Sequence, residues 1–554
     1  MMKFKNLLFT LSCLILLPFA ASCHGKKEIH EFIVPEEFDN SENYEISFWA
    51  KNDTNMIQKR IYEQAIVDFE SLYPNIKVNM RQFSDYGQIY KDVLINIKTN
   101  TTPNVCISYP DHVATYLSNE NLVVPLDNLI SNEKYGLGGS KVLFDSPKES
   151  EVFPKFMQEC FYNKNQYLLP FMRSTEACYI NQDYVEKLGF KVPEVLTWDF
   201  MWEVASKALD EYTGEQVLLP IIYKSVDNQL ITMLKQKNIP YTTANGEIDL
   251  FSDGTKLVLK DLGYHTATGE FEIFAVTSYP GNYFNVGRTI FAIDSTAGAT
   301  WMGEKAPQIE IEESKIAHFK TVVRPVPQYD VNNQFMISQG PSICVFNKDD
   351  PQVVMASWLF ASFLLNNSVQ IPYSETEGYL PVTSKAFDSP DYQAYLNSAG
   401  KENYDDWDDS YISAKKYYNG KSRNLSAASF FYDTKIDATK LVYDNINNTF
   451  ITPVFNGSTA VRNAAGYLIE MTIKEVNKHA NDINGDNYED YISDDFIKSL
   501  YDSTINRYKL DVVESKLSST AIIMLILLGL AWVYIAGYGL TIFLKNHKKK
   551  KKRL

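Results

Sequence analysis

The segment that most constrains the fold is residues 167–184, Tyr-Leu-Leu-Pro-Phe-Met-Arg-Ser-Thr-Glu-Ala-Cys-Tyr-Ile-Asn-Gln-Asp-Tyr. Apolar runs with the length of short strands lie on both sides of the polar group Arg173, Ser174 and Thr175. Polar side chains within a strand need hydrogen-bonding partners, so the pattern predicts a chain that crosses from one lobe to another and turns these residues toward a cleft. An ordinary strand with a buried, paired arginine accounts for the same residues equally well.

The chain is too long for one core, and its 554 residues predict two to four domains. The formal net charge is −15, and no basic stripe interrupts the chain before its last ten residues, which argues against a nucleic-acid partner. The seven histidines lie far apart in the sequence, so no spacing indicates a metal site. No cofactor is expected.

The N-terminus has the pattern of a secretory signal. Lys3 and Lys5 precede an apolar run, and Ala-Ala-Ser-Cys follows at residues 20–23. This predicts a lipoprotein-type signal peptide at residues 1–23 with lipidation at Cys23, and plain cleavage is the alternative. Residues 24–43 are charged and lack periodicity, so they are predicted to form a tether.

The C-terminus has the pattern of a membrane anchor. Residues 517–544 contain no charged side chain, and a transmembrane helix needs about 20 such residues. The basic residues that follow at 545–554 predict a cytoplasmic tail, because positively charged flanks stay on the cytoplasmic side. The sequence therefore predicts a protein of the cell membrane whose folded part is extracellular.

Alternation and helical spacing at the start of the ectodomain predict a βαβ unit, with strands at 44–49 and 76–80 and a helix between them. A further helix at 86–97 and a strand at 104–108 extend it. In such sheets ligands sit at the carboxyl ends of the strands. The cleft loops are therefore expected at residues 51–54, 84–86 and 109–111. The region after the crossover, to about Phe274, is predicted to be mainly helical.

Two other features have more than one interpretation. Cys160 and Cys178 flank the crossover and could form a disulfide, although single buried thiols fit as well. Residues 405–409, Asp-Asp-Trp-Asp-Asp, could supply the carboxylates of a glycoside-cleaving enzyme, but clustered acids usually form a solvated loop. A membrane-tethered sensor is a third class of function, and it would need a partner chain for signalling.

Five segments in this order resemble the extracellular solute-binding proteins of carbohydrate-type ABC importers, and among them most closely the glycerol-3-phosphate and maltose binders. The segments are Phe48-Trp49, residues 65–75 (Ala-Ile-Val-Asp-Phe-Glu-Ser-Leu-Tyr-Pro-Asn), residues 178–184, residues 287–293 (Gly-Arg-Thr-Ile-Phe-Ala-Ile) and residues 378–382 (Gly-Tyr-Leu-Pro-Val). The resemblance implies a non-enzymatic protein that captures a carbohydrate or glycerol-3-phosphate-type solute and delivers it to an ABC permease.

The resemblance also implies the fold, a two-lobed α/β periplasmic-binding-protein-like (type II) structure with three hinge crossings. The crossings are expected near Arg173, at residues 328–335 and near Gly378. Lobe 1 would comprise residues 44–172 and 335–377, and lobe 2 residues 173–334 and 378–510. Ligand binding would close the cleft between the lobes.

The family's motifs also imply six ligand-binding residues. These are Tyr86, Asp111, Ser174, Ser295, Tyr379 and Arg462. Two departures from the family pattern bear on the ligand: residues 223–229 contain none of the expected tryptophans, and Asp111 is shorter than the expected glutamate.

Overall fold

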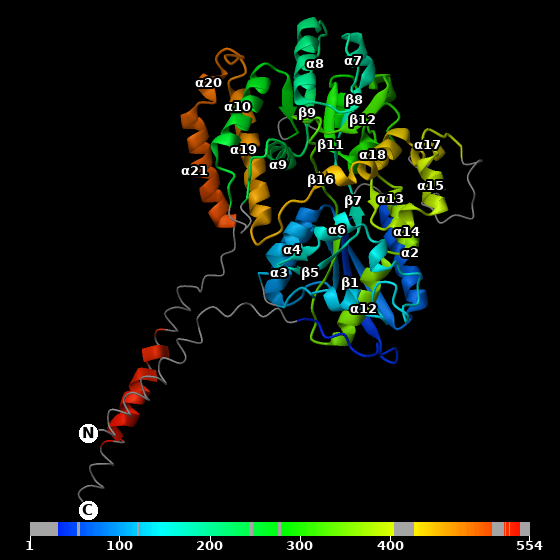
Figure 1. Ribbon diagram of the computed structural model, residues 1–554, viewed down its shortest axis with the longest axis vertical. Helices are drawn as coiled ribbons and strands as arrows, with labels where there is room; N and C mark the ends of the chain where they lie inside the picture. Colours follow the sequence, from blue (N-terminus) through cyan, green and yellow to red (C-terminus); the bar gives the residue numbers. More distant parts are fainter. Residues whose placement is uncertain are drawn as a thin grey trace, which may run out of the picture. The chain divides into compact units, whose positions relative to one another are not determined.

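The computed structural model describes residues 31–51, 56–118, 121–242, 248–274, 279–403 and 426–511, and parts of 526–544. The described residues up to Asp511 form one compact unit, and the described parts of 526–544 belong to a second unit. Two separate clusters of buried apolar side chains define two lobes within the first unit, each built on one five-stranded sheet (Figure 1).

The sheet of lobe 1 is mixed, with the order β2-β1-β3-β14-β6. Its strands are β1 (Tyr44–Lys51), β2 (Ile76–Phe83), β3 (Val105–Ser108), β6 (Leu168–Pro170) and β14 (Ser342–Val345). β1 runs parallel to β2 and β3, whereas β14 is antiparallel to β3 and β6. The predicted βαβ unit is therefore present, because α2 (Met56–Leu72) connects β1 to β2.

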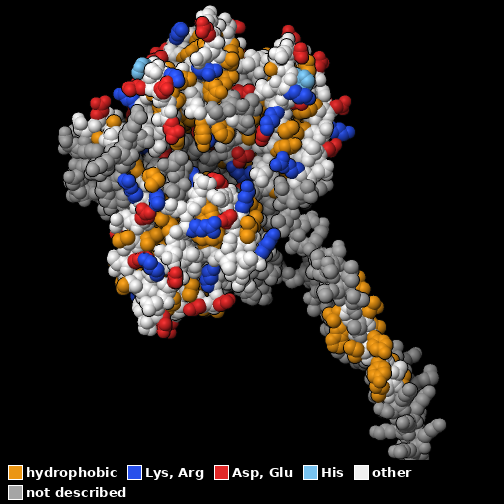
Figure 2. Space-filling view, turned by 180° about the vertical axis from the view of Figure 1, so that it is seen from behind, with side chains coloured by type: hydrophobic (Ala, Val, Ile, Leu, Met, Phe, Trp, Pro, Cys, Tyr) orange, Lys and Arg blue, Asp and Glu red, His pale blue; other side chains and the backbone are white. Residues whose placement is uncertain are grey.

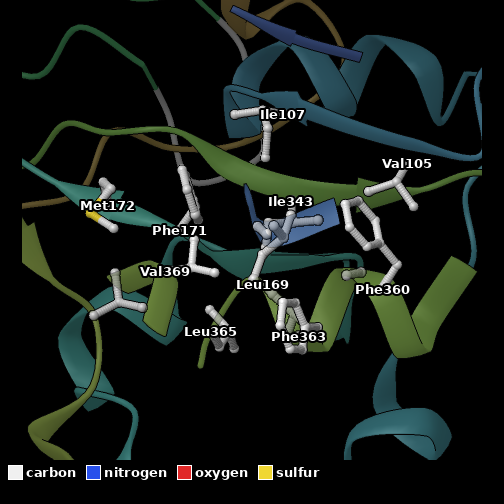
Figure 3. Close-up of a cluster of buried hydrophobic side chains, with 14 of the residues drawn as sticks. Val105, Ile107, Leu169, Phe171, Met172, Ile343, Phe360, Phe363, Leu365 and Val369 are labelled. Atoms are coloured by element: carbon white, nitrogen blue, oxygen red, sulfur yellow. The ribbon is translucent and has the colours of Figure 1, made fainter. Parts of the chain in front are cut away.

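Helices contribute buried apolar side chains to the core of lobe 1. Apart from α2 they are α3 (Tyr86–Thr99), α4 (Pro110–Tyr116), α5 (Asp127–Ile130), α6 (Pro154–Gln158), α12 (Pro351–Phe363), α13 (Asn367–Ser374), α14 (Ser384–Phe387), α15 (Pro390–Leu396) and α17 (Ala427–Phe430). Figure 3 shows Phe360 and Phe363 of α12 directed toward the strand residues Leu169 and Ile343. All four side chains are almost completely buried, so hydrophobic burial holds α12 against the sheet.

The sheet of lobe 2 has the order β10-β9-β11-β8-β12. Its strands are β8 (Glu176–Asn181), β9 (Ile221–Tyr223), β10 (Phe271–Ile273), β11 (Phe291–Ser295) and β12 (Thr321–Pro325). Its helices are α7 (Gln182–Lys187), α8 (Trp198–Glu211), α9 (Val226–Gln236), α10 (Asp253–Ala267), α11 (Pro280–Phe284), α19 (Ser458–Lys478), α20 (Tyr488–Tyr491) and α21 (Asp494–Asp511). The sequence missed β9 and β10, because three residues are too few to display alternation.

The first crossing lies where the sequence predicts it. β7 (Met172–Arg173) pairs with β15 (Leu380–Pro381) of lobe 1, and β8 of lobe 2 begins at Glu176. The prediction that Arg173 faces the cleft is wrong, because its side chain is fully buried. Its guanidinium donates hydrogen bonds to the carbonyls of Met172 and Pro341 at 2.9 Å, and its Nε lies 3.6 Å from a carboxylate oxygen of Glu159. The alternative interpretation, a buried and paired arginine, holds for this residue.

The second crossing lies later in the chain than the predicted residues 328–335. β13 (Met336–Ile337) still packs in lobe 2, and β14 belongs to lobe 1, so the chain crosses at 338–341. The first two crossings pair, since the backbones of Ser174 and Gln339 exchange hydrogen bonds of 2.8 and 3.0 Å. Gly340 has φ +140°, and a Cβ there would lie 2.1 Å from the Met172 carbonyl oxygen. Only glycine allows this approach.

The third crossing differs most from the prediction. Residues 379–396 and 427–436 bury their apolar side chains in lobe 1, although 378–510 was predicted to be lobe 2. The chain returns to lobe 2 along α18 (Asp433–Asp444), where Ile436 contacts the core of lobe 1 and Leu441 that of lobe 2. Gly378 nevertheless marks a contact between lobes, because a Cβ there would lie 2.1 Å from the carbonyl oxygen of Thr296.

The predicted tether also needs a correction over its second half. Phe38 is 4% exposed and belongs to the core of lobe 1. The Glu37 carboxylate forms ion pairs with Lys134, at 2.8 Å, and with Lys141. One apolar anchor and these charge pairs fix the segment on lobe 1, and the sequence pattern hid both. Residues 24–30 lie outside the described part of the chain.

The predicted signal peptide, Cys23 and the basic tail also lie outside the described residues, and the predicted membrane segment 517–544 lies partly outside them. Within the described part of the chain, no single helix has the length and apolar character to cross a membrane. α12 and α13 meet the criterion only together, bent by 50°, and an apolar helix described at Leu528–Ile542 is shorter. The membrane anchor therefore stays a prediction.

Candidate functional site

A cavity of about 580 Å³ lies between the two lobes and is lined by residues from both. The surface is hollowed between the upper and lower halves of the folded region, and acidic and basic side chains lie around the hollow (Figure 2). All six predicted ligand-binding residues lie in the cavity lining. The structure thus brings them together, and their contact with a ligand stays a prediction.

The lobe 1 wall comes from loops that follow the parallel strands, as the sequence predicts. Asp85 caps α3 by accepting a hydrogen bond from the Gln88 amide at 2.8 Å, and this places Tyr86 at the start of the helix. The ring of Tyr86 lies 4.6 Å from that of Tyr109, and Lys51 Nζ lies 5.4 Å from the centre of the Tyr86 ring. The wall therefore presents two aromatic rings beside a cation.

The lobe 2 wall includes the loop at the end of β11. Ser295 caps the 3₁₀ helix η2 (Thr296–Trp301), since its hydroxyl accepts a hydrogen bond from the Ala297 amide at 3.2 Å. The Ser295 hydroxyl also lies 3.5 Å from the Ser174 hydroxyl of the first crossing. Trp301, at the other end of η2, stacks with Tyr279 at 6.2 Å and an interplanar angle of 17°.

These two rings give lobe 2 an aromatic surface at the cavity, although residues 223–229 contain none of the expected tryptophans. The sequence contained a weak signal for Trp301, which lies three residues after Gly298 at the end of the small and polar segment 295–300. It contained none for Tyr279, because only the fold brings that residue beside η2.

Arg462 lies in the second turn of α19 and is already paired within lobe 2. One guanidinium nitrogen donates to Asp227 at 2.8 Å and also to the side-chain oxygen of Asn228. Near this pair α19 touches lobe 1, because the Thr459 hydroxyl donates to the backbone oxygen of Asp111 at 3.1 Å. The predicted residues Asp111 and Arg462 therefore meet where the two lobes contact each other.

The second ion pair of the lining is Lys224 with Asp294. Lys224 Nζ lies 2.8 Å from each carboxylate oxygen of Asp294 and 4.7 Å from the centre of the Tyr279 ring. Gly298 lies beside this carboxylate, since a Cβ there would approach an Asp294 oxygen to 3.0 Å. The sequence indicated neither partner, because the two residues are 70 positions apart.

The described lining carries more acidic than basic side chains. The carboxylates are Asp111, Glu159, Asp227, Asp294 and Glu377, and the cations are Lys51, Lys224 and Arg462. Tyr379 completes the lining on the side of Gly378, and Glu377 accepts a hydrogen bond of 2.5 Å from the Thr300 hydroxyl. The cavity therefore offers many hydrogen-bond acceptors, several aromatic faces and cations that largely have carboxylate neighbours.

His112 also lines the cavity, stacked 4.6 Å from the ring of Tyr90. Burial lowers its pKa, which favours the neutral imidazole, and the neighbouring Asp111 opposes this only in part. In the described residues, no group of three or more His, Cys, Asp or Glu side chains could hold a metal ion. The acidic segment 405–409 lies outside them.

The four cysteines of the folded unit, Cys106, Cys160, Cys178 and Cys344, are free and buried. Cys160 belongs to the core of lobe 1 and Cys178 to that of lobe 2, so the possible disulfide between them is absent. They behave as small apolar core residues.

The model of the bacterial extracellular solute-binding protein family matches residues 64–399, which is more than half of the chain. This chain belongs to that family. The match includes the sheet of lobe 2, the sheet of lobe 1 apart from β1, the first two crossings and most of the cavity lining. A search of curated proteins finds no match.

Solved structures confirm the mixed α/β periplasmic-binding-protein-like fold. The GacH receptor of Streptomyces glaucescens, solved with acarbose, is 14% identical, with a TM-score of 0.53 over 82% of this chain and 99% of that one. Maltose-bound MalE3 of T. maritima is 13% identical, with a TM-score of 0.55 over 83% of this chain and 100% of that one. UgpB of Mycobacterium tuberculosis, in complex with glycerophosphocholine, is 14% identical, with a TM-score of 0.54 over 83% of this chain and 99% of that one. Identities this low establish the fold only.

Proposed function

We propose that this protein is the substrate-binding component of an ABC importer, and that it captures a carbohydrate between its lobes and delivers it to a permease. The observation that carries the proposal is the cavity of about 580 Å³, lined from both lobes by aromatic rings and hydrogen-bond acceptors. A ligand that touches both lobes favours closure, because only differential contact between open and closed states shifts their populations.

The aromatic side chains support a sugar as the ligand. Tyr86 and Tyr109 lie on one wall, and Tyr279 and Trp301 on the other. Aromatic rings are flat apolar faces that pack on the C–H faces of sugar rings, and tyrosine adds a polar tip. Carboxylates such as Asp111 and Glu377 accept hydrogen bonds from hydroxyl groups.

The charges favour a neutral carbohydrate over glycerol-3-phosphate. Lys224 and Arg462 each face a carboxylate of the lining at 2.8 Å. A phosphate would have to compete with Asp294 and Asp227 for these cations and would meet the repulsion of the remaining acids. A neutral sugar can bind without breaking either pair. Ion pairing and hydrogen bonding to a sugar account for the carboxylates of the lining without catalysis. We therefore propose that the protein is not an enzyme.

Calorimetric titration of the full chain tests the ligand class. Maltose and maltotriose represent neutral sugars, and glycerol-3-phosphate and glycerophosphocholine represent the phosphate class. We expect micromolar or tighter binding of a sugar and none of glycerol-3-phosphate. Binding of glycerol-3-phosphate with no response to any sugar of a wider panel would overturn the carbohydrate assignment.

The location is part of the proposal. We propose a lipoprotein-type signal at 1–23 with Cys23 lipidated, a transmembrane helix at 517–544 and a cytoplasmic tail at 545–554. Protease added to intact cells should then degrade the folded domain and leave a C-terminal epitope intact. Loss of that epitope would contradict the topology.

A further inference from the structure

A chain of hydrogen bonds runs from Arg462 at the cavity wall into the interior of lobe 2. Arg462 donates to the side-chain oxygen of Asn228, whose Nδ2 in turn donates to Glu176 Oε1 at 3.2 Å. The Tyr223 hydroxyl donates to the other Glu176 oxygen. Asn228 and Arg462 line the cavity, whereas Glu176 and Tyr223 lie beneath it, each 1% exposed.

The direction of the Asn228 amide is the sensitive element of this chain. A side-chain amide donates at one end and accepts at the other. Because Glu176 takes the donor end, the oxygen of Asn228 faces the guanidinium of Arg462. If Glu176 could not accept, the donor end of the amide would lose its anchor, and the amide could rotate and carry its oxygen away from the guanidinium. The position of Glu176 is fixed by β8, where it pairs in register with Ser295.

We propose that Glu176 is a positioning residue for ligand recognition, which holds the Arg462 guanidinium at the cavity wall through Asn228 without touching the ligand. This inference deepens the proposed function and rests on it, because it treats Arg462 as a ligand contact. Nothing in the sequence distinguished Glu176 from the other carboxylates, since its role depends on neighbours 47 and 52 positions away.

The surroundings of Glu176 make this role dependent on pH. The groups that face it are Tyr223 on β9, Asp294 on β11, Asp227 on α9 and Arg462 on α19. Burial, with smaller contributions from Asp227 and Asp294, raises the pKa of Glu176 to about 8 against the opposing hydrogen bonds from Tyr223 and Asn228. Above that pH the ionised Glu176 carboxylate attracts the Arg462 guanidinium deeper into lobe 2 and away from the ligand. Affinity for a sugar should therefore fall as the pH rises through about 8.

Two variants of Glu176 separate positioning from charge. In Glu176→Leu no acceptor remains for Asn228, and we expect the affinity of the full chain for maltose at pH 7 to fall by up to about fivefold, the effect of about one hydrogen bond. Glu176→Gln keeps an acceptor but cannot ionise. It should bind maltose nearly as well as wild type at pH 7 and lose the weakening between pH 7 and 9.

Glu272 provides the matched control. It is a buried carboxylate in the same sheet, 8% exposed, and accepts a hydrogen bond of 2.9 Å from Asn477 Nδ2, but it does not line the cavity or contact Arg462. Glu272→Leu should lower thermal stability without changing maltose affinity or its pH profile. Equal weakening in Glu272→Leu, wild-type affinity in Glu176→Leu, or a preserved pH effect in Glu176→Gln would each overturn the proposal.

A ligand-free measurement keeps this inference separable from the proposed function. Crystal structures of the unliganded wild type and Glu176→Leu should differ in the Arg462 side chain, which in the variant leaves Asn228. If wild type binds no sugar, the proposed function fails while this displacement still supports positioning. An unchanged Arg462 in the variant, or failure of Glu176→Leu to fold together with an unaltered pH profile in Glu176→Gln, would refute it.

Discussion

At the residue scale, the cavity side chains are held by partners that lie far away in the sequence. Arg462 pairs with Asp227, and Lys224 pairs with Asp294, both at 2.8 Å. Each pair fixes a cation that a neutral ligand can reach and a phosphate would have to pull from its carboxylate. The consequences of removing one partner therefore report on the class of ligand.

The first prediction concerns Arg462→Ala. With a neutral sugar as ligand, the change removes about one hydrogen bond, so maltose affinity should fall by about 1 kcal/mol, roughly fivefold. With an anionic ligand the loss would be several kcal/mol, because a desolvated anion would lose its partner. Arg462→Lys should recover only part of the loss, since lysine lacks the planar fork of donors. Calorimetry measures all three proteins.

Arg324 is the control for this change. Its side chain is 23% exposed against 22% for Arg462, and it pairs with Glu194 at 3.2 Å, but it lies outside the cavity lining. Arg324→Ala should leave maltose affinity unchanged. Wild-type affinity in Arg462→Ala, with the fold intact, would remove Arg462 from the site.

A second prediction at this scale concerns Lys435, which is fully buried and donates to the carbonyls of Glu375 and Phe430 at 2.7 Å. Burial lowers its pKa from 10.5 to about 7, with Glu377 and Glu375 opposing. Between these values the unfolded chain binds more protons than the folded one, so stability rises with pH in that window and this contribution is level below pH 7.

Lys435→Met removes the titration. The free energy of unfolding of wild type, relative to that of the variant, should therefore rise between pH 7 and 9 by at most about 1.4 kcal/mol per pH unit. The melting temperature of wild type should rise with it. Scanning calorimetry at several pH values measures the difference. The exposed Lys474, paired with Glu470, is the comparison, and Lys474→Met should show no such slope. A pH-independent difference for Lys435→Met would show that the amine is charged throughout.

At the scale of elements, one arginine ties the first two crossings to lobe 1. Arg173 donates to the carbonyl of Met172 in the first crossing and to that of Pro341 in the second, and at 3.0 Å to the hydroxyl of Ser342, where β14 of lobe 1 begins. Glu159 on its other side accepts a hydrogen bond from Ser338. Residues 174–175 and 338–339 join this anchored region to the strands of lobe 2, and they are therefore the expected pivot of closure.

The prediction for this element is that Arg173→Met destabilises the protein by about 3 kcal/mol. The change removes four donated hydrogen bonds and leaves Glu159 buried without its cation. Thermal unfolding of the full chain measures the loss. Arg288→Met, which removes a hydrogen bond from a half-buried arginine to the Val217 carbonyl, should cost far less. Equal effects of the two changes would contradict the role of Arg173 in tying the first two crossings to lobe 1.

At the scale of the whole molecule, the two lobes meet on both sides of the cavity. Thr459 of α19 donates to Asp111 of α4, and Gly378 packs on the backbone of Thr296. These contacts between the lobes involve few residues compared with the apolar core of each lobe. A ligand that contacts Tyr109 on one wall and Trp301 on the other would therefore dominate the balance between open and closed states.

The prediction at this scale is ligand-driven compaction. Small-angle scattering of the full chain should give a smaller radius of gyration with saturating maltose than without it, because closure brings the lobes together. Tryptophan at position 378 in place of glycine should hold the lobes apart, since even a Cβ there would lie 2.1 Å from the Thr296 oxygen. An unchanged curve at saturation in wild type would indicate a rigid receptor.

The sequence by itself determined the features that depend on local pattern. Period-two and helical spacing located the βαβ unit at 44–83 and the strand that follows it, and Lys51, Tyr86 and Tyr109 of the cavity lie at or just after the carboxyl ends of these three strands. The polar group at 173–175 located the first crossing. The family motifs selected six residues that all line the cavity, because such motifs preserve positions at which a fold presents side chains to a cleft.

Only the tertiary structure decided which of these groups are paired and which lobe each segment joins. Lys224 with Asp294, Arg462 with Asp227 and Asn228 with Glu176 are separated by 70, 235 and 52 residues. Residues 379–396 look like any other helical segment until their apolar faces meet the core of lobe 1. Pairing and burial are properties of groups brought together through space, and local spacing along the chain carries no record of them.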